Sequence, residues 1–430
     1  MLKPVAEIRD PVHGYIKITE VERELIDSPF VQRLRRIHQL AGAYLVYPGA
    51  VHTRFDHVVG AMYVAGLIAE SLANRIGIEK EEIQAIRLAA LLHDVGHGPF
   101  SHIYEEVLAE KTNTTHEDIS QRMILETPLK DILEKNGYSS NKMSEFCVGK
   151  QASKPRFMNE IIAGGLSADI MDYLLRDSYF TGVEYGKVDI HRIIDSLDVI
   201  NKHLALDQAA VYAFEALLIA RYEMFKAVYF HRTVRAAELM LVHAMALADR
   251  ELELTDLSVF GKYLELTDET VLQRLTSLDA KSSDLQEARR LAKGFRDRRL
   301  VKCVFERVIQ RRDRIVEQIF DKASVRTRVV LDLAEKAKVD PMYIYLDVPT
   351  TPSVPYTSSR ESLRAVILFS DFGRKRRHES TPIDKLPLAG SIIGFMDAVR
   401  VYTTSEYRGR VSRATKALLN NEEYMSGISN

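Results

Sequence analysis

Histidines gather in one short part of this sequence. The chain has 13 histidines, and six of them fall within a single stretch, at His52, His57, His93, His97, His102 and His116. His93 and Asp94 directly follow the apolar run Leu88–Leu92, which predicts a helix buried on all sides. A buried carboxylate without a partner is so costly that it is normally neutralised or bound to a cation. An imidazole and a carboxylate at the end of one rigid helix can therefore bind the same metal ion, although any single histidine here could be an ordinary core or surface residue.

The other ligands of such a metal must come from elsewhere in the chain. His57 lies on a preceding apolar helix, which we expect Gly77 to end, and Asp169 begins a further helix. Two imidazoles and two carboxylates suit Mn, Fe, Zn, Ni, Co or, less well, Mg, and do not choose among these metals. We therefore expect one divalent metal per chain, bound by His57, His93, Asp94 and Asp169.

These four residues follow the H…HD…D pattern of the HD superfamily of metal-dependent phosphohydrolases. The sequence resembles most closely the branch of deoxynucleoside triphosphate triphosphohydrolases related to the human sterile-alpha-motif/HD-domain protein. An HD pair alone is a weak signal, whereas the whole string from His93 to His102, with Arg54 three residues before His57, is specific. The resemblance covers about residues 5–300 well and is carried by Arg9–Gly14, Gln32–Arg35, Gln39-Leu40, Pro48–Ala50, Arg54–His57, His93–His102, His116-Glu117 and the helix from Asp169.

The resemblance implies hydrolysis at the α-phosphorus of a nucleotide, with release of the deoxynucleoside and intact triphosphate. Cationic donors are what a polyanion in a dry cleft requires, and the positions that hold the triphosphate match Arg54, His97, His102 and His116. His102, oriented by Glu105, is the predicted acid that protonates the leaving 5′-oxygen. His116 could instead simply begin a helix, and Arg54 could pair with a local acid.

The same resemblance predicts contacts to the sugar and the base. The tyrosine that matches Tyr173 packs where a 2′-hydroxyl would lie. The residues that match Gln39 and Asp177 bind the 3′-hydroxyl, and Leu40 belongs to the same short motif as Gln39. Tyr229 resembles an aromatic residue that lies beside the base. Together these five residues are the predicted substrate contacts besides Arg54.

The helix from Asp169 also supports a purely structural interpretation, and it contains one departure from the family. Asp172 and Arg176 can form an i, i+4 ion pair, with Tyr173 in the core. Ile170 stands where the human relative has a phosphate-binding lysine. If no other cation replaces that lysine, triphosphate affinity is weaker or the substrate is a smaller phosphate ester. Three nearby residues could supply the charge, namely Lys226, Arg232 and Arg235.

A second nucleotide site is predicted near the N-terminus. Asp27, Gln32 and Arg35 match residues that read a guanine between subunits in the relatives, which predicts a homo-oligomer, a tetramer or dimer, activated by GTP or dGTP. Ala6 stands where the human relative has a lysine, which weakens this prediction. Ordinary surface polarity before a helix is the alternative.

The elements that must position these residues are mainly helical, since helical periodicity dominates the central part of the chain. We expect an N-terminal mixed segment at 1–50 that holds the possible regulatory site, a helical HD catalytic core at 51–325 and a smaller α+β C-terminal unit at 326–430. Helices are predicted at 188–201 and 304–322, and a long one at 208–248 is expected to break near Tyr229. Strands rich in Val, Ile and Tyr are predicted at 342–348, 365–369 and 398–402.

Composition narrows the partners. A net charge of −1 gives no global signal for nucleic acid or an anionic membrane. The basic stretch from Arg296 to Arg314 contains interleaved acids, which predicts a solvated helix face or a subunit contact rather than nucleic-acid binding. Two distant cysteines and the lack of a signal-peptide or membrane-spanning pattern predict a reduced, cytoplasmic protein.

Three functions are compatible with these observations. The leading hypothesis is a metal-dependent triphosphohydrolase acting on deoxynucleoside triphosphates. The second is an HD phosphomonoesterase or phosphodiesterase acting on nucleoside monophosphates or cyclic nucleotides, and Ile170 is its best support. The third is a nucleotide-sensing or nucleic-acid-binding HD protein. A complete ligand set argues against the third, because binding alone needs no metal-activated water.

Overall fold

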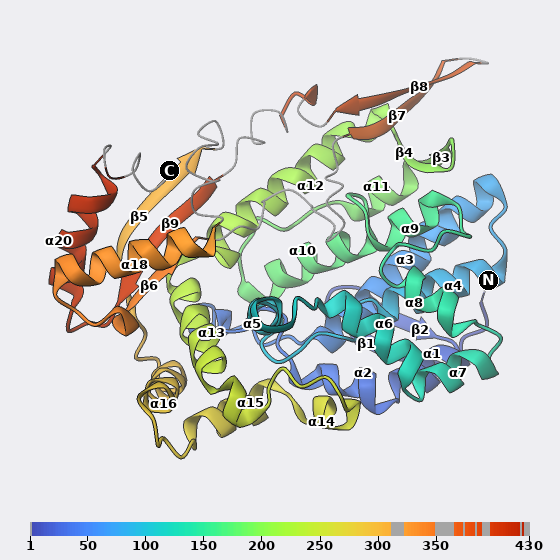
Figure 1. Cartoon of the computed structure of the whole chain (residues 1–430). Coiled ribbons are helices and arrows are strands. Elements are labelled where there is room, and N and C mark those ends of the chain that lie inside the picture. The colour runs from blue at the N-terminus through green and yellow to red at the C-terminus, as the bar shows by residue number, and fades with distance from the viewer. Residues whose placement is uncertain are drawn as a thin grey trace.

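The computed structural model describes residues 2–310, 322–348, 365–372, 375–382, 385–388, 396–421 and 424, and the statements below concern these residues. The fold is mainly helical with small sheets in the C-terminal region, as predicted (Figure 1). Of the basic stretch considered above, Arg311, Arg312 and Arg314 lie outside the described residues.

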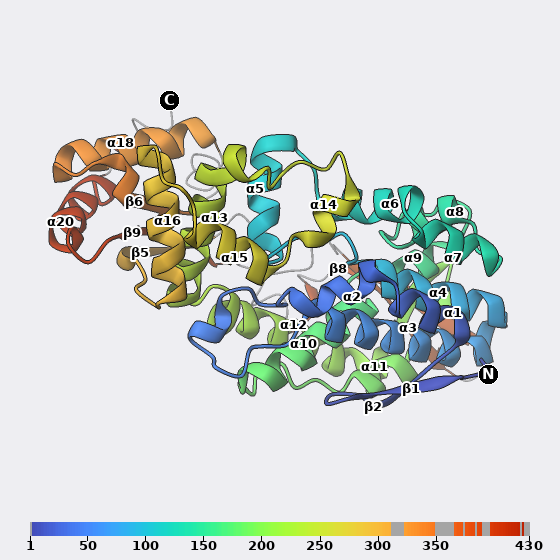
Figure 2. The same cartoon turned by 90° about the horizontal axis from the view of Figure 1, so that it is seen from below.

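A two-stranded hairpin begins the fold. β1 (Ala6–Asp10) pairs antiparallel with β2 (Gly14–Ile18), and Asp10 faces Gly14 across the turn. Gly14 has a φ of +79°, a backbone conformation that favours glycine at this turn. The hairpin lies along one edge of the molecule, where β2 packs beside α3 (Arg54–Ile76) (Figure 2). Short helical elements then follow it, namely α1 (Glu20–Ile26), α2 (Pro29–Arg33), η1 (Leu34–Arg36) and η2 (Ala43–Leu45).

The centre of the fold is the pair of apolar helices predicted from the sequence. α3 (Arg54–Ile76) begins at a capping box formed by Thr53 and Asp56, and Gly77 ends it in the left-handed conformation, as predicted. α4 (Lys80–Leu92) packs against α3, and its residues Leu88–Leu92 are fully buried. α3 is the one described helix with the length and composition to cross a membrane, and 72% of its most apolar window is buried inside the fold.

Further helices surround this pair. α10 (Ala168–Thr181) packs directly on α3, and α13 (Arg232–Leu252) packs on both α5 (His102–Thr112) and α16 (Ser283–Arg296). The predicted break near Tyr229 is confirmed, because a π-helical turn, η4 (Phe225–Tyr229), separates α12 (Val211–Met224) from α13. The remaining helices of this region are α6 (His116–Glu126), α7 (Leu129–Lys135), α8 (Ser140–Phe146), α9 (Arg156–Ile162), α11 (Ile190–Asp195), η3 (Gln208–Ala210), α14 (Phe260–Glu265) and α15 (Asp268–Thr276).

Two larger sheets involve the C-terminal part. One has the order β5 (Lys302–Gln310), β9 (Met396–Thr403), β6 (Ile344–Asp347), with antiparallel pairs, and packs with α18 (Ala323–Ala337) and α20 (Arg408–Leu419) around a separate apolar cluster. The other has the order β3 (Leu197–Ile200), β4 (His203–Asp207), β7 (Ala365–Phe372), β8 (Lys375–Pro382), in which β4 and β7 are parallel. The β7–β8 hairpin projects from the helical core, while η5 (Pro341–Tyr343) leads into β6 (Figure 1).

Three predicted strands are confirmed as β6, β7 and β9, but two predicted helices are wrong in part. The segment predicted as a helix at 304–322 begins as strand β5, because its β-branched and aromatic residues pair along β9 from Lys302↔Thr403 to Gln310↔Met396. The helix predicted at 188–201 ends as α11 at Asp195, and the following Leu197–Ile200 pairs with β4 instead. In both places a cross-strand partner distant in sequence outweighs local helical periodicity.

Candidate active site

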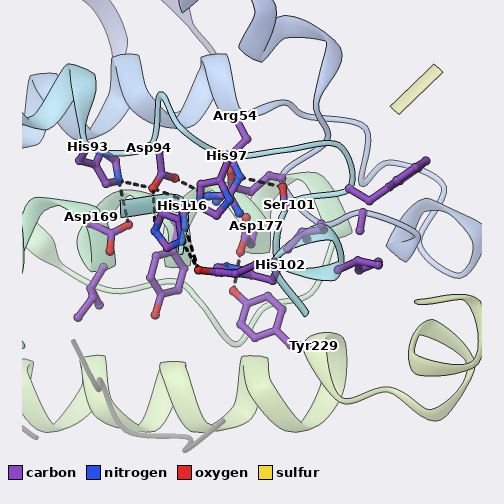
Figure 3. A pocket seen from close by; sticks show the side chains of 18 of the residues that line it. Arg54, His93, Asp94, His97, Ser101, His102, His116, Asp169, Asp177 and Tyr229 are labelled. Atoms are coloured by element: carbon purple, nitrogen blue, oxygen red, sulfur yellow. Dashed lines mark hydrogen bonds and ion pairs between the residues drawn. The ribbon is translucent and has the colours of Figure 1, made fainter. Parts of the chain in front are cut away.

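The four side chains predicted to bind metal converge on one point. They come from α3, from the residues that follow α4, and from the first turn of α10. Nε2 of His57 lies 3.1 Å from Oδ1 of Asp169, and Nε2 of His93 lies 3.3 Å from Oδ1 of Asp94. The longer separations, from His57 to Asp94 and from His93 to Asp169, are both 3.8 Å. His93, Asp94 and Asp169 lie together at one side of the pocket in Figure 3.

Hydrogen bonds on the far side of each ring leave Nε2 available as a ligand. Nδ1 of His57 donates to Oδ2 of Asp172 at 2.8 Å, and Nδ1 of His93 donates to the carbonyl oxygen of Ala90 at 2.7 Å. Both Nε2 atoms are buried and have no hydrogen-bond partner among the described residues. A proton held on Nδ1 directs the lone pair of Nε2 toward a metal. Ligand atoms of His57, His93 and Asp94 lie within 4.8 Å of one another, and Oδ1 of Asp169 lies near both imidazoles, so the donor set fits a divalent cation.

The charges around the ligands also favour a cation. Burial lowers the pKa of His57, but the carboxylates of Asp169 and Asp172 outweigh it and raise the pKa to about 10. Burial raises the pKa of Asp94, yet the nearby His93, His97 and Arg54 hold it well below its usual range. The cluster thus keeps its carboxylates charged and retains positive charge at its centre, which a divalent metal supplies more strongly than a proton.

Arg54 joins the metal cluster to the next part of the pocket. Its guanidinium donates through Nη1 to Oδ2 of Asp94 and through Nε to Oγ of Ser101 at 2.8 Å. The remaining nitrogen, Nη2, is buried and has no partner among the described residues. The local acid proposed as an alternative partner is therefore Asp94 itself, and Arg54 still presents one nitrogen for another acceptor. Ser101 was not predicted as a site residue, although it lies within the motif.

Three histidines form the adjacent wall. The rings of His97 and His116 stack at 3.9 Å, and Nε2 of His97 lies 3.3 Å from Oδ1 of Asp94. Burial and the neighbouring Arg54 and His116 lower the pKa of His97 well below its usual value. His116 begins α6, as its structural interpretation predicted, and it also faces the pocket.

Glu105 holds two of these histidines at once. Its Oε1 accepts from Nδ1 of His116 at 2.7 Å, and its Oε2 accepts from Nδ1 of His102 at 3.1 Å. Burial lowers the pKa of His116, but Glu105 outweighs it and raises the pKa to about 9. The His102 side chain is 70% exposed against 20% for His116, so the predicted acid is the more accessible of the two.

A further part of the pocket lining carries the residues predicted to bind the sugar and base. Asp177 accepts from Nε2 of His52 at 2.8 Å and from the hydroxyl of Tyr229 at 2.5 Å (Figure 3 shows Asp177 and Tyr229). Tyr173 accepts a hydrogen bond at its hydroxyl from Nη1 of Arg221, on α12. Sequence reasoning missed the roles of His52 and Arg221, because both contacts join helices or loops that are far apart in the chain.

These residues line one cavity of about 600 Å³. Its lining includes the predicted Gln39, Leu40, Arg54, Tyr173, Asp177 and Tyr229, as well as His93, Asp94, Asp169 and the group His97, His102, Glu105 and His116. His57 is fully buried behind this surface. The predicted regulatory residues lie elsewhere: Asp27 caps α1, while Gln32 and Arg35 bond to each other at 3.0 Å near α2.

Of the three cations predicted as replacements for the missing lysine, Arg235 is the one that lines this cavity. Ile170 lines the cavity, as does Arg235, but Arg235 is bound to Asp347 at 2.9 Å and Glu238 at 2.7 Å. Arg221 lines the cavity as well, and its guanidinium lies over the rings of Tyr173 and Phe225. Among the residues that line this cavity, neither Lys226 nor Arg232 is found.

Comparison with protein families agrees with this geometry. The HD domain family matches residues 54–177, which contain all four predicted metal ligands, and the family of HD associated regions matches residues 188–426. The chain belongs to the HD domain phosphohydrolases. As an HD phosphohydrolase it has a His/Asp cluster consistent with binding of a divalent metal.

Similar proteins cover most of this HD phosphohydrolase. An uncharacterized protein of Methanocaldococcus jannaschii is 35% identical over 62% of this chain and 57% of its own length. The deoxynucleoside triphosphate triphosphohydrolase SAMHD1 homolog of Dictyostelium discoideum is 31% identical over 70% of this chain and 60% of its own. The chain thus spans well under two thirds of these relatives. The crystal structure of a hypothetical protein from Aquifex aeolicus is similar to this fold, with a TM-score of 0.73. The two sequences are 27% identical, and the match covers 96% of this chain and 100% of that one.

Proposed function

We propose that this HD phosphohydrolase hydrolyses deoxynucleoside triphosphates at the α-phosphorus, giving a deoxynucleoside and triphosphate. The observation that carries the proposal is the order of side chains along one cavity. In Figure 3 the metal-ligand residues His93, Asp94 and Asp169 lie at one side of the pocket, His97 and His116 lie next to them, and Asp177 and Tyr229 lie beyond. A nucleotide has the same order of groups, from phosphate through sugar to base. The named relative from Dictyostelium discoideum supports this substrate class.

The phosphate end is prepared for an anion. Nη2 of Arg54 is a buried nitrogen without a partner among the described residues, and a phosphate oxygen would satisfy it. His116 is held by Glu105 and can donate from Nε2, while the neighbouring His102 shares the same carboxylate. A bound divalent metal would polarise a phosphate oxygen or lower the pKa of a water molecule. His102 would then give its proton to the leaving 5′-oxygen, with Glu105 fixing the ring.

The sugar end is prepared for a deoxyribose. Asp177 is held on one side by His52, and its other oxygen is bound by Tyr229, so the carboxylate is fixed before substrate arrives. Gln39 has a buried Oε1 without a partner among the described residues, which can accept from a sugar hydroxyl. The anchored ring of Tyr173 would occupy the space of a 2′-hydroxyl. Arg221 lines the same cavity and can supply a positive charge that Ile170 does not.

Product analysis tests the proposal. The protein loaded with Mn²⁺ is incubated with each deoxynucleoside and ribonucleoside triphosphate, and the products are separated by ion-exchange chromatography. Inorganic triphosphate and deoxynucleoside are the expected products. Pyrophosphate with nucleoside monophosphate, or no turnover of any triphosphate, would refute the proposed reaction.

One observation favours a second enzyme function. The cavity wall near Asp169 is apolar where the human relative has a lysine, because Ile170, Cys147, Val148 and Ile162 line it. Such a wall suits a substrate with fewer phosphates, which is the phosphomonoesterase or phosphodiesterase alternative. Release of inorganic phosphate from a nucleoside monophosphate, or of a nucleoside monophosphate from a cyclic nucleotide, would select it when these compounds replace the triphosphates in the assay.

We also propose that the enzyme is a homo-oligomer whose activity rises with GTP or dGTP. The support is the grouping of Asp27, Gln32 and Arg35 outside the cavity, with Asp27 and Arg35 exposed. The guanidinium of Arg35 lies 3.4 Å from the centre of the Phe55 ring. Phe55 belongs to α3, the helix that also carries Arg54 and His57. A ligand that moved Arg35 would therefore act on the first turn of α3.

A further inference from the structure

Asp172 is a buried carboxylate that touches no substrate-facing surface, yet it is bound to a predicted metal ligand. It is 0% exposed and does not line the cavity. Its two oxygens accept four hydrogen bonds, of which two come from Arg176, at 2.9 and 2.8 Å, one from His57 at 2.8 Å and one from His13 at 2.7 Å. Such a carboxylate has no acceptor capacity left over, so its orientation is fixed by these donors.

The fourth donor, His13, comes from the N-terminal hairpin, which contributes no residue to the cavity lining. His13 lies in the turn between β1 and β2, and its side chain is 5% exposed. The turn is built to direct this ring inward: Oδ1 of Asp10 accepts from the backbone nitrogens of Val12 and His13 at 2.9 and 2.7 Å. Oδ2 of Asp10 accepts from Nη1 of Arg176 at 2.8 Å, so the turn is bound to α10 twice.

We propose that His13 is a positioning residue for the metal site, acting through Asp172 on His57. Nε2 of His13 and Nη2 of Arg176 hold Oδ1 of Asp172, which keeps Oδ2 directed at Nδ1 of His57. The proton on Nδ1 of His57 then stays in place, and Nε2 remains a ligand for the metal. Partners of this kind, one step removed from the metal, change affinity by about 10- to 100-fold when they are lost.

A purely structural role for His13 would be to anchor the hairpin, and the two roles are separable. The contact from Asp10 to Arg176 also anchors the hairpin, but it does not touch Asp172 or His57. Because Asp10 still holds the hairpin to α10 when His13 is replaced, a His13 variant can stay folded while it loses the bond to Asp172. Loss of the His13 contact should weaken metal binding even where the fold is intact.

The test measures metal affinity rather than activity. The full chain is stripped of metal and titrated with Co²⁺ in competition with a chelator, and the visible absorption of bound Co²⁺ reports the ligand geometry. His13→Leu is expected to bind Co²⁺ about 10- to 100-fold more weakly than wild type. His13→Gln keeps a donor that can reach Asp172 and should retain most of the affinity. His203→Gln is the matched control. His203 also pairs with a carboxylate, Glu160, at 2.7 Å, but it does not line the cavity.

Each outcome decides the proposal. Wild-type affinity in a folded His13→Leu protein, or equal losses in the leucine and glutamine variants, would overturn it. If His13→Leu does not fold by circular dichroism, Asp172→Asn replaces it, and unchanged affinity in that variant also overturns the proposal. Failure of the wild type to bind Co²⁺ is a different result, since it removes the metal site and with it the proposed reaction.

Discussion

Gly60 is the point at which α3 comes closest to the buried ion pair of α10. Asp172 and Arg176 are both 0% exposed. A Cβ atom added at Gly60 would lie 2.0 Å from Oδ1 of Asp172 and 2.2 Å from Nη2 of Arg176. Real Cβ atoms essentially never approach other heavy atoms within 3.0 Å, so Gly60→Ala must displace the pair by about 1 Å.

The cost of that displacement follows from the contacts described above. The hydrogen bonds of Asp172 measure 2.7 to 2.9 Å, and a shift of about 1 Å takes some of them out of range. Overpacking costs about 1–3 kcal/mol, and a lost hydrogen bond to a buried charge costs about 1.5–3 kcal/mol. Replacing a glycine within a helix by alanine raises the free energy of unfolding by only about 0.5–1 kcal/mol. We therefore expect Gly60→Ala to lower the free energy of unfolding by about 2–5 kcal/mol.

Urea denaturation followed by circular dichroism measures this loss. Gly261→Ala is the matched control, since it is also a helical glycine but its added Cβ would have only one neighbour, Val259, at 3.8 Å. The control should change stability by less than about 1 kcal/mol. Equal stability of Gly60→Ala and wild type would refute the reasoning, because it would mean that the ion pair can move without cost.

Four further outcomes are expected. Asp94→Ala should lose both metal and activity while the helical content is retained, and full metal occupancy by elemental analysis would contradict the ligand assignment. His116→Ala should keep its metal and lose turnover by about 10²–10⁴-fold, as for a positioned acid or charge stabiliser, whereas loss of metal would indicate a second metal nearby. Tyr173→Ala and Arg221→Gln should both reduce the ratio of kcat/KM for dGTP over GTP, and equal turnover of the two nucleotides by wild type would refute the sugar argument. GTP should raise the rate on dATP and shift sedimentation in wild type but not in Asp27→Ala, and no effect in wild type would remove the regulatory site.

Much of the site could be predicted because histidines and aspartates rarely follow one another along a chain in the order found here. A buried histidine and aspartate at the end of an apolar helix favour a bound cation, and the whole string from His93 to His102 is specific, so His93 and Asp94 were identifiable without a structure. His57 and Asp169 complete the set, and all four side chains converge as expected. Asp172 was predicted only as the ion-pair partner of Arg176. That pair is present, but the additional bond to His57 depends on how α3 and α10 pack.

The residues that were missed are those whose partners lie far along the chain. His13 hydrogen-bonds to Asp172, His52 to Asp177 and Arg221 to Tyr173. No local sequence pattern indicates these contacts. The same limit explains the error at β5. The charged residues of β5 recur at spacings that suit an amphipathic helix. Its pairing with β9 is not visible locally, because β9 begins far along the chain at Met396.

The parallel pairing of β4 with β7 has a consequence during synthesis of the protein. Ala205 pairs with Ile367, so β4 leaves the ribosome about 160 residues before its partner does. At about 5–20 residues per second, one edge of β4 stays open for about 8–30 s. An open strand edge is a template for pairing with other chains, and β4 carries the apolar Leu204 and Leu206. Nascent or truncated chains that end before β7 should therefore be the species of this protein most prone to aggregation.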